Sequence, residues 1–182
     1  MLFRSGHKYT VGPDGNIRFT VTSNGFTGDM WAKYFENIGM VVGGSTKNTL
    51  HVVKEAPTTI ETYNVVVRPG KLLNDAARVV SRIREGGEFC GWKVPHWEVG
   101  CLLRDKLTEA DLEQMGLAYI VVMHEPIACA YDGAPKLLIL TVASFDPDYR
   151  QLHDSFATPA RGYDEKGGFA FIEAPRPNYP KN

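Results

Sequence analysis

A chain of 182 residues with 43% hydrophobic and 23% charged residues has the composition of an ordinary globular protein. Its formal net charge of −1 argues against a dedicated nucleic-acid-binding or membrane-surface protein. A chain of this length can bury a sizeable core without metal ions or disulfide bonds. We therefore expect a single domain over residues 1–174, followed by a mobile, proline-broken tail over residues 175–182.

The cysteines and the chain's hydropathy suggest a compartment. Cys90, Cys101 and Cys129 leave one thiol over in any disulfide pairing, so a reducing environment is the simpler interpretation. No apolar run reaches the roughly 18 residues of a membrane span. Met1–His7 lacks the apolar stretch of a signal peptide. We expect a soluble cytoplasmic protein that makes no membrane contact.

The first elements are a hairpin and a helix. Residues 7–11 and 17–22 flank a turn-rich segment, and apolar and polar residues alternate in the second run, which predicts paired strands. Thr27 is a suitable N-cap, and Trp31, Tyr34, Phe35 and Ile38 follow at helical spacing before Gly39.

The next region combines a poorly defined part with two clear elements. Residues 40–54 show no regular period, although the apolar residues near their end favour the start of a strand. Residues 60–67 predict a strand that ends at a proline–glycine pair. The apolar spacing over residues 72–83 predicts a second helix, closed by Gly86 and Gly87.

The second half of the chain gives the strongest fold signals. A third helix begins near Pro95, and Thr108 with Asp111 has the pattern of a capping box for a fourth helix that Gly116 ends. Two almost purely apolar strands follow, over residues 117–123 and 137–142, and we expect them to pair antiparallel. A short final strand covers residues 169–172. Strands and helices without strict alternation predict an α+β domain with a largely antiparallel sheet and about four helices on one face.

Residues 144–166 are expected to form a long loop. Phe145, Tyr149, His153 and Tyr163 belong to a mixture of aromatic and charged residues that is typical of recognition surfaces. An alternative is that this segment contains a short helix, or pairs loosely along the edge of the sheet, and buries its aromatic side chains in the core. We take these four residues as candidate binding residues.

His124, Glu125 and Pro126 end the first apolar strand, where functional groups are often found. His124 is a candidate general base, with Glu125 or Glu98 to orient it. The interpretation that we favour is structural: Pro126 keeps Glu125 extended, and His124 fills a half-buried position bonded to the backbone.

Cys101 with His124 is a candidate thiol nucleophile and base. Cys101 lies well inside the expected third helix, away from the helix N-terminus that would lower the pKa of a thiol, so a buried core residue is the commoner role. Cys90 and His96 would complete a set of four zinc ligands, but the spacings match no common zinc motif. We expect no metal and no other cofactor.

Lys71, Arg78 and Arg82 fall within one narrow sector of the helix expected over residues 72–83. They are candidate binding residues for an anion or for nucleic acid. Two nearby acidic residues dilute this charge, so a solvated helix face is the commoner explanation.

Five motifs together resemble a family of short bacterial proteins, seen in environmental and candidate-phylum genomes, that has no assigned activity. The motifs are Phe19–Gly25 with Thr27, Gly28 and Trp31; Glu98–Arg104; Met115–Leu117; Met123–Ile127; and Gly167–Phe171. The chain departs from the family between Phe89 and His96, where the family has more lysines. The resemblance implies a bacterial origin but brings no site residues.

The leading interpretation is a non-catalytic interaction module that binds another protein through the 144–166 loop and the strand end at His124 and Glu125. A small hydrolase that uses Cys101 or His124, with Glu98 or Glu125, is the alternative. An anion- or nucleic-acid-binding protein is the third.

Overall fold

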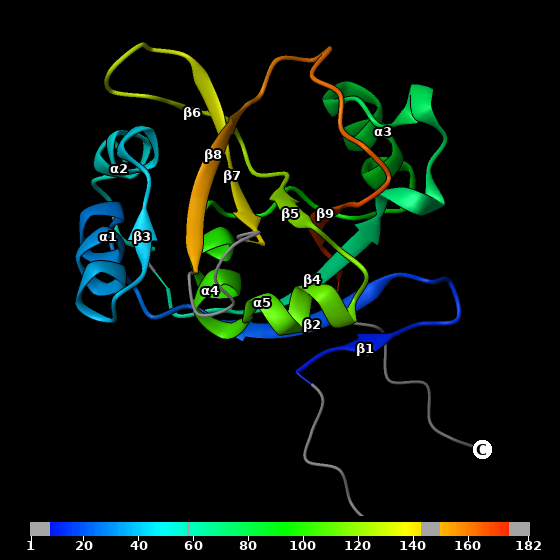
Figure 1. Ribbon diagram of the computed structural model, residues 1–182, viewed down its shortest axis with the longest axis horizontal. Coiled ribbons are helices and arrows are strands. Elements are labelled where there is room, and N and C mark those ends of the chain that lie inside the picture. Colours follow the sequence, from blue (N-terminus) through cyan, green and yellow to red (C-terminus); the bar gives the residue numbers. More distant parts are fainter. Residues whose placement is uncertain (1–7, 58, 143–149, 175–182) are drawn as a thin grey trace, which may run out of the picture.

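The computed structural model describes residues 8–57, 59–142 and 150–174. The tail expected over residues 175–182, as well as Phe145 and Tyr149, lies outside the described residues. The α+β class is confirmed, because one mixed sheet is packed against helices that are interspersed among its strands in sequence (Figure 1).

The described strands form one nine-stranded sheet in the order β1-β2-β4-β9-β5-β7-β8-β3, with β6 paired to β7. Most neighbours are antiparallel, as predicted, whereas β5 with β9 and β3 with β8 are parallel. The last strand, β9, therefore lies between β4 and β5. The strands are β1 (Thr10–Val11), β2 (Ile17–Thr22), β3 (Val41–Val42), β4 (Thr62–Pro69), β5 (Tyr119–Val122), β6 (Ile127–Ala128), β7 (Pro135–Thr141), β8 (Gln151–Phe156) and β9 (Gly167–Ile172).

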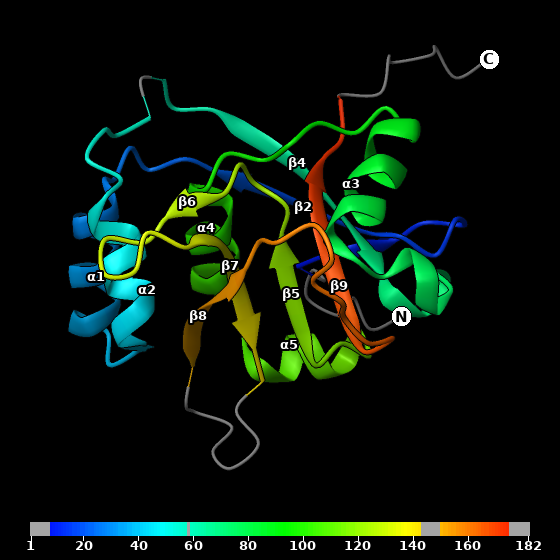
Figure 2. The ribbon, with the colours of Figure 1, turned by 90° about the horizontal axis from the view of Figure 1, so that it is seen from above.

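The helices lie at three places around the sheet (Figures 1 and 2). α1 and α2 pack together beside β3 and β8, α4 and α5 occupy the middle, and α3 lies on the far side beside β9. None of the helices in the described part is long and apolar enough to cross a membrane. The helices are α1 (Gly28–Asn37), α2 (Gly44–His51), α3 (Val80–Phe89), α4 (Glu98–Lys106) and α5 (Glu109–Gln114), with 3-10 turns η1 (Gly70–Leu72) and η2 (Asp75–Ala77).

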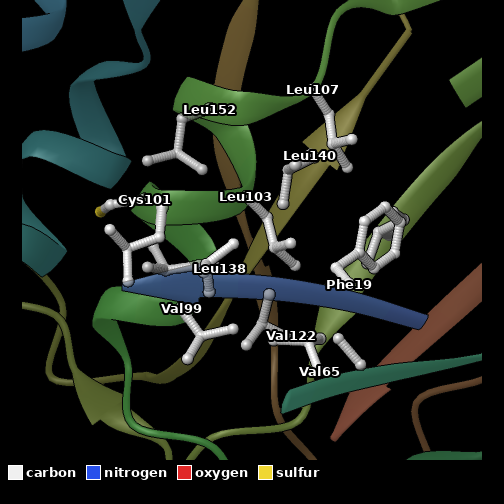
Figure 3. Packing of buried hydrophobic residues seen from close by; sticks show 14 of the residues in the cluster. Phe19, Val65, Val99, Cys101, Leu103, Leu107, Val122, Leu138, Leu140 and Leu152 are labelled. Carbon is white, nitrogen blue, oxygen red and sulfur yellow. The ribbon is translucent and has the colours of Figure 1, made fainter. Parts of the chain in front are cut away.

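Helix α4 is the centre of the main core. Every residue from Glu98 to Arg104 is buried, and the helix contacts β2 on one side and β7 and β8 on the other. Figure 3 shows its side chains surrounded by those of several strands. Gly100 allows the close approach to β7, because a Cβ atom there would lie 3.0 Å from the Leu138 side chain. The apolar side chains of α4 are buried against these strands, and this packing explains why so short a helix is stable.

A second apolar cluster lies on the opposite face of the sheet. α1, α2, α4 and α5 all contribute to the first cluster, whereas α3 packs in the second through Val80 and Ile83. The expectation of helices on one face therefore holds for four helices and is wrong for α3. Gly86 and Gly87, which were expected to close the helix, both lie inside α3. Gly87 allows the close contact with β9, because a Cβ atom there would lie 2.5 Å from the Phe171 ring.

Several expected elements are present. β2 pairs with β1 and β4, and Thr27 caps α1 by accepting a hydrogen bond from the Met30 N–H. Thr108 and Asp111 form a complete capping box at α5, and Gly116 has a φ of 72°. β5 and β7 pair antiparallel, as predicted.

Three expectations are wrong. Residues 44–51 form helix α2, although their sequence has low helix propensity, because contacts with α1 and β8 decide the local structure. Residues 151–156 form β8, within the segment that was expected to be a loop. Residues 70–77 form two 3-10 turns, and α3 begins only at Val80, so Lys71, Arg78 and Arg82 do not lie on one helix.

A buried ion pair ties the C-terminal end of α4 to its surroundings. Arg104 is fully buried, and its Nη1 lies 3.0 Å from Oε1 of Glu109. The same guanidinium donates to the carbonyl oxygens of Leu107 (2.5 Å), Thr141 (3.3 Å) and Gln151 (3.4 Å). One side chain thus joins α4 to the helix after it and to strands β7 and β8.

Candidate functional site

Five elements meet at one end of the sheet. The parallel strands β5 and β9 both end there, β2 ends beside the first residue of β4, and α4 begins there. In Figure 2 the chain between α3 and α4 passes beside the ends of β4 and β9, and Lys93 pairs with Ile172 through a β-bridge. The site is built from side chains of these segments.

A buried carboxylate is the inner part of the site. Glu98 is fully buried, and its two oxygens accept hydrogen bonds from the Tyr63 hydroxyl (2.6 Å) and the Ser23 hydroxyl (2.8 Å). Burial and the bond to Glu98 hold the pKa of Tyr63 well above its usual range, so the phenol keeps its proton and donates it. These bonds fix the positions of three side chains from three distant parts of the chain.

His96 covers this carboxylate on the solvent side. Its Nδ1 accepts a hydrogen bond from the backbone N–H of Glu98 (3.3 Å) and lies 3.7 Å from Oε1 of the same residue. The ring also packs against Trp97, with centroids 5.3 Å apart. Because Nδ1 is an acceptor, a neutral His96 carries its proton on Nε2 and presents a donor from there.

His96 and Tyr63 line a groove of about 600 Å³, which we call the β4–β9 groove. Two apolar side chains near it are exposed: Ile60, which is 75% exposed, and Val94, which is 45% exposed. The lining residues with ionisable side chains are Glu61, Tyr63, Lys93, His96, Glu125 and Glu173.

A second hollow, of about 480 Å³, adjoins this groove. The two share Asn64, Glu173 and Ala174 among their lining residues. Its cationic side chains are already bonded: Arg18 lies 2.8 Å from Glu173, and Lys106 donates to the Thr20 carbonyl oxygen at 2.7 Å. Together the hollows form one elongated depression across β4.

His124 contacts backbone groups, as expected, but it is fully buried where a half-buried position was expected. Its Nε2 accepts from the backbone N–H of Leu138 (2.9 Å), and its Nδ1 contacts the Glu125 carbonyl oxygen (2.6 Å). Burial lowers its pKa to about 4, and the nearby Arg84 acts in the same direction. Protonation of Nε2 would also remove the bond from Leu138. Glu125, in contrast, is exposed and lines the β4–β9 groove.

This environment predicts a pH dependence of stability. An unfolded chain protonates His124 near its ordinary pKa of 6.5, whereas the folded chain does so near 4, so the unfolded state binds more protons between these values. The stabilisation is complete above pH 6.5 and is lost as the pH falls towards 4, by at most about 3 kcal/mol. Urea unfolding across this range is expected to give a flatter pH profile for His124→Gln. Parallel profiles for the variant and the parent chain would contradict this.

Cys101 has no access to a substrate from solvent. It is fully buried on α4, and burial together with the charge of Glu98 raises the pKa of its thiol well above the ordinary value. The thiolate that a nucleophile requires is therefore disfavoured. Glu98 is engaged by Ser23 and Tyr63 rather than by His124.

The other predicted binding residues lie elsewhere. Arg78 donates to the Leu73 carbonyl oxygen at 3.1 Å, and Arg82 pairs with Glu85 at 2.7 Å, while Lys71 lies in η1. Their positive charges do not form a common surface on one helix.

His153 lies on β8, where it contacts Gln151, and burial lowers its pKa. Tyr163 packs on Phe169 and lines a hollow of about 470 Å³ that shares no lining residue with the β4–β9 groove. The sequence analysis had assigned Tyr163 and Glu125 to one contact surface, whereas in the structure they line separate hollows.

The sequence did not single out Ser23 or Tyr63, and it considered His96 only as a zinc ligand. Among the described residues, no group of three or more His, Cys, Asp or Glu side chains is placed to hold a metal ion. Comparisons with protein-family models, curated proteins and solved structures found no match. The resemblance to a bacterial family stays a prediction.

Proposed function

We propose that this protein is a non-catalytic binding module and that a segment of another protein binds in the β4–β9 groove. The observation that carries the proposal is the combination of a fixed polar interior with an exposed apolar rim. Glu98, Ser23 and Tyr63 hold the interior in place, the exposed Val94 lines the groove, and the exposed Ile60 lies in sequence between the lining residues Thr59 and Glu61. Protein-binding sites combine anchoring pockets with apolar contact area in this way.

The orientation of His96 also favours binding over acid–base catalysis. A carboxylate orients a catalytic imidazole by accepting a hydrogen bond from the ring N–H that faces it. Here the facing nitrogen, Nδ1, accepts from the Glu98 N–H, so the neutral ring carries its proton on Nε2. A neutral His96 therefore offers a ligand a hydrogen-bond donor and no basic nitrogen.

The hydrolase alternative has less support from the same geometry. Cys101 is buried with a raised pKa, and both ring nitrogens of His124 contact backbone groups. Neither side chain lines the β4–β9 groove.

Selection of a random heptapeptide display library on the full chain tests the proposal. The selected peptides are resynthesised, and their affinity is expected to fall at least about tenfold when Ile60 and Val94 are both changed to Ser, because apolar anchors carry most binding energy. The matched control changes Val41 and Val52, which are also exposed, to Ser. Failure to select any peptide, or equal losses in both double variants, would contradict the proposal.

A further inference from the structure

The charges around the β4–β9 groove are unbalanced. Glu61 and Glu125 line it and are exposed, and the fully buried Glu98 lies behind His96. Glu98 accepts hydrogen bonds from two neutral hydroxyl groups, and Nδ1 of His96 lies 3.7 Å from its Oε1. Neutral donors stabilise a carboxylate without cancelling its field.

The cations near the groove offset only part of this charge. Lys93 lines it, Arg84 lies 3.9 Å from Glu125, and Arg18 is shared between Glu173 and Asp14. Among its described lining residues the groove presents the carboxylates of Glu61, Glu125 and Glu173 against the one lysine, Lys93, and Glu98 lies buried behind His96. Such a site attracts a cation.

The surroundings of these carboxylates are amphipathic. The apolar side chains of Ile60 and Val94 are exposed and adjoin lining residues, including Glu61 and Lys93. A Lys or Arg side chain matches this arrangement, because its apolar stem can cover the aliphatic rim while its charged end reaches the carboxylates. The adjoining second hollow, joined through Asn64 and Glu173, continues the depression, as an extended segment requires.

We propose that the partner segment is basic and extended, and that it places a Lys or Arg side chain between Glu61, Glu125 and the aliphatic rim of the groove. This rests on the proposed function, since it specifies the chemistry of the ligand bound there. The second hollow receives the neighbouring residues of the same segment.

The test uses the full chain and the peptides selected on it. The expected result is enrichment of Lys or Arg in peptides that the rim double variant fails to bind. Replacing that residue by Gln in the peptide, or Glu61 and Glu125 by Gln in the protein, should each weaken binding on the order of tenfold. The loss should shrink at high salt, because exposed charge pairs are screened. Glu113→Gln removes an exposed carboxylate of α5 outside the groove and should leave the affinity unchanged.

Each contrary outcome has a separate meaning. Peptides that bind in the groove but lack Lys and Arg would contradict the proposal of a basic segment, and so would peptides whose affinity does not change in the Glu61 and Glu125 variants. Neither result would contradict the proposed binding function. Putrescine binding as tightly as the peptides would show that a small cation, not a segment, is the ligand. Peptides that bind equally well to the rim variant would overturn both proposals. Thermal unfolding of every variant verifies that the fold is intact.

Discussion

The Arg104→Met variant is expected to lose about 3–5 kcal/mol of unfolding free energy, which would be the largest single effect among the variants considered. The guanidinium is fully buried beside Glu109 and donates to the carbonyl oxygens of Leu107, Thr141 and Gln151. Met fills a similar volume but donates no hydrogen bond. The change therefore leaves a buried carboxylate without its cation and leaves buried carbonyl groups without a donor.

Chemical denaturation of Arg104→Met measures this loss, and Arg82→Met is the matched control. Arg82 pairs with Glu85 at 2.7 Å, but both side chains are exposed, so we expect less than about 1 kcal/mol there. Adding Glu109→Gln to Arg104→Met should recover part of the stability, because it removes the negative charge of a buried side chain that has lost the guanidinium. If Arg104→Met is too unstable to purify, Glu109→Gln alone is expected to lose about 1–3 kcal/mol. Equal effects at Arg104 and Arg82 would contradict the role of the buried pair.

Leu103→Ala is expected to lose about 2–5 kcal/mol, the second large effect. Leu103 is fully buried on α4 and lies in the cluster where side chains of β2, β7 and β8 meet (Figure 3). Removing its branched end leaves a cavity that a helix enclosed by strands on two sides cannot easily close.

The control for Leu103→Ala is Leu72→Ala, since Leu72 is 42% exposed in η1 and the chemical change is identical. We expect a change within about 0.5 kcal/mol at this surface position. Urea unfolding with unchanged m-values would attribute the difference to the native packing. A similar loss at both positions would show that α4 is not the centre of the core.

Local sequence signals predicted the elements whose structure is determined locally. Thr108 and Asp111 specify the start of α5 through their own hydrogen bonds, and the apolar run before His124 is a buried strand. The signals failed where tertiary contacts decide. The hydroxyls of Ser45 and Thr49 on α2 both donate to Asp154 on β8, at 2.8 Å, although neither element has a clear pattern of its own.

The candidate site was only partly predictable for a related reason. Glu98 and Glu125 were predicted as carboxylates that could orient His124. Both lie at the site, but Glu98 accepts hydrogen bonds from Ser23 and Tyr63 instead. Ser23 and Tyr63 are separated from Glu98 by 75 and 35 positions in the sequence, so only the pairing of β2 with β4 and the placement of α4 bring them together. No residue spacing within one segment carries that information.

The position of β9 between β4 and β5 has a consequence for how the chain acquires its structure during synthesis. Until residues 167–172 have left the ribosome, β4 and β5 belong to two separate half-sheets, each with an unpaired edge where the centre will be. Open edges of this kind can pair with other chains. The nascent protein is therefore exposed to aggregation until β9 has been synthesised, and this strand completes the folding of both halves at once.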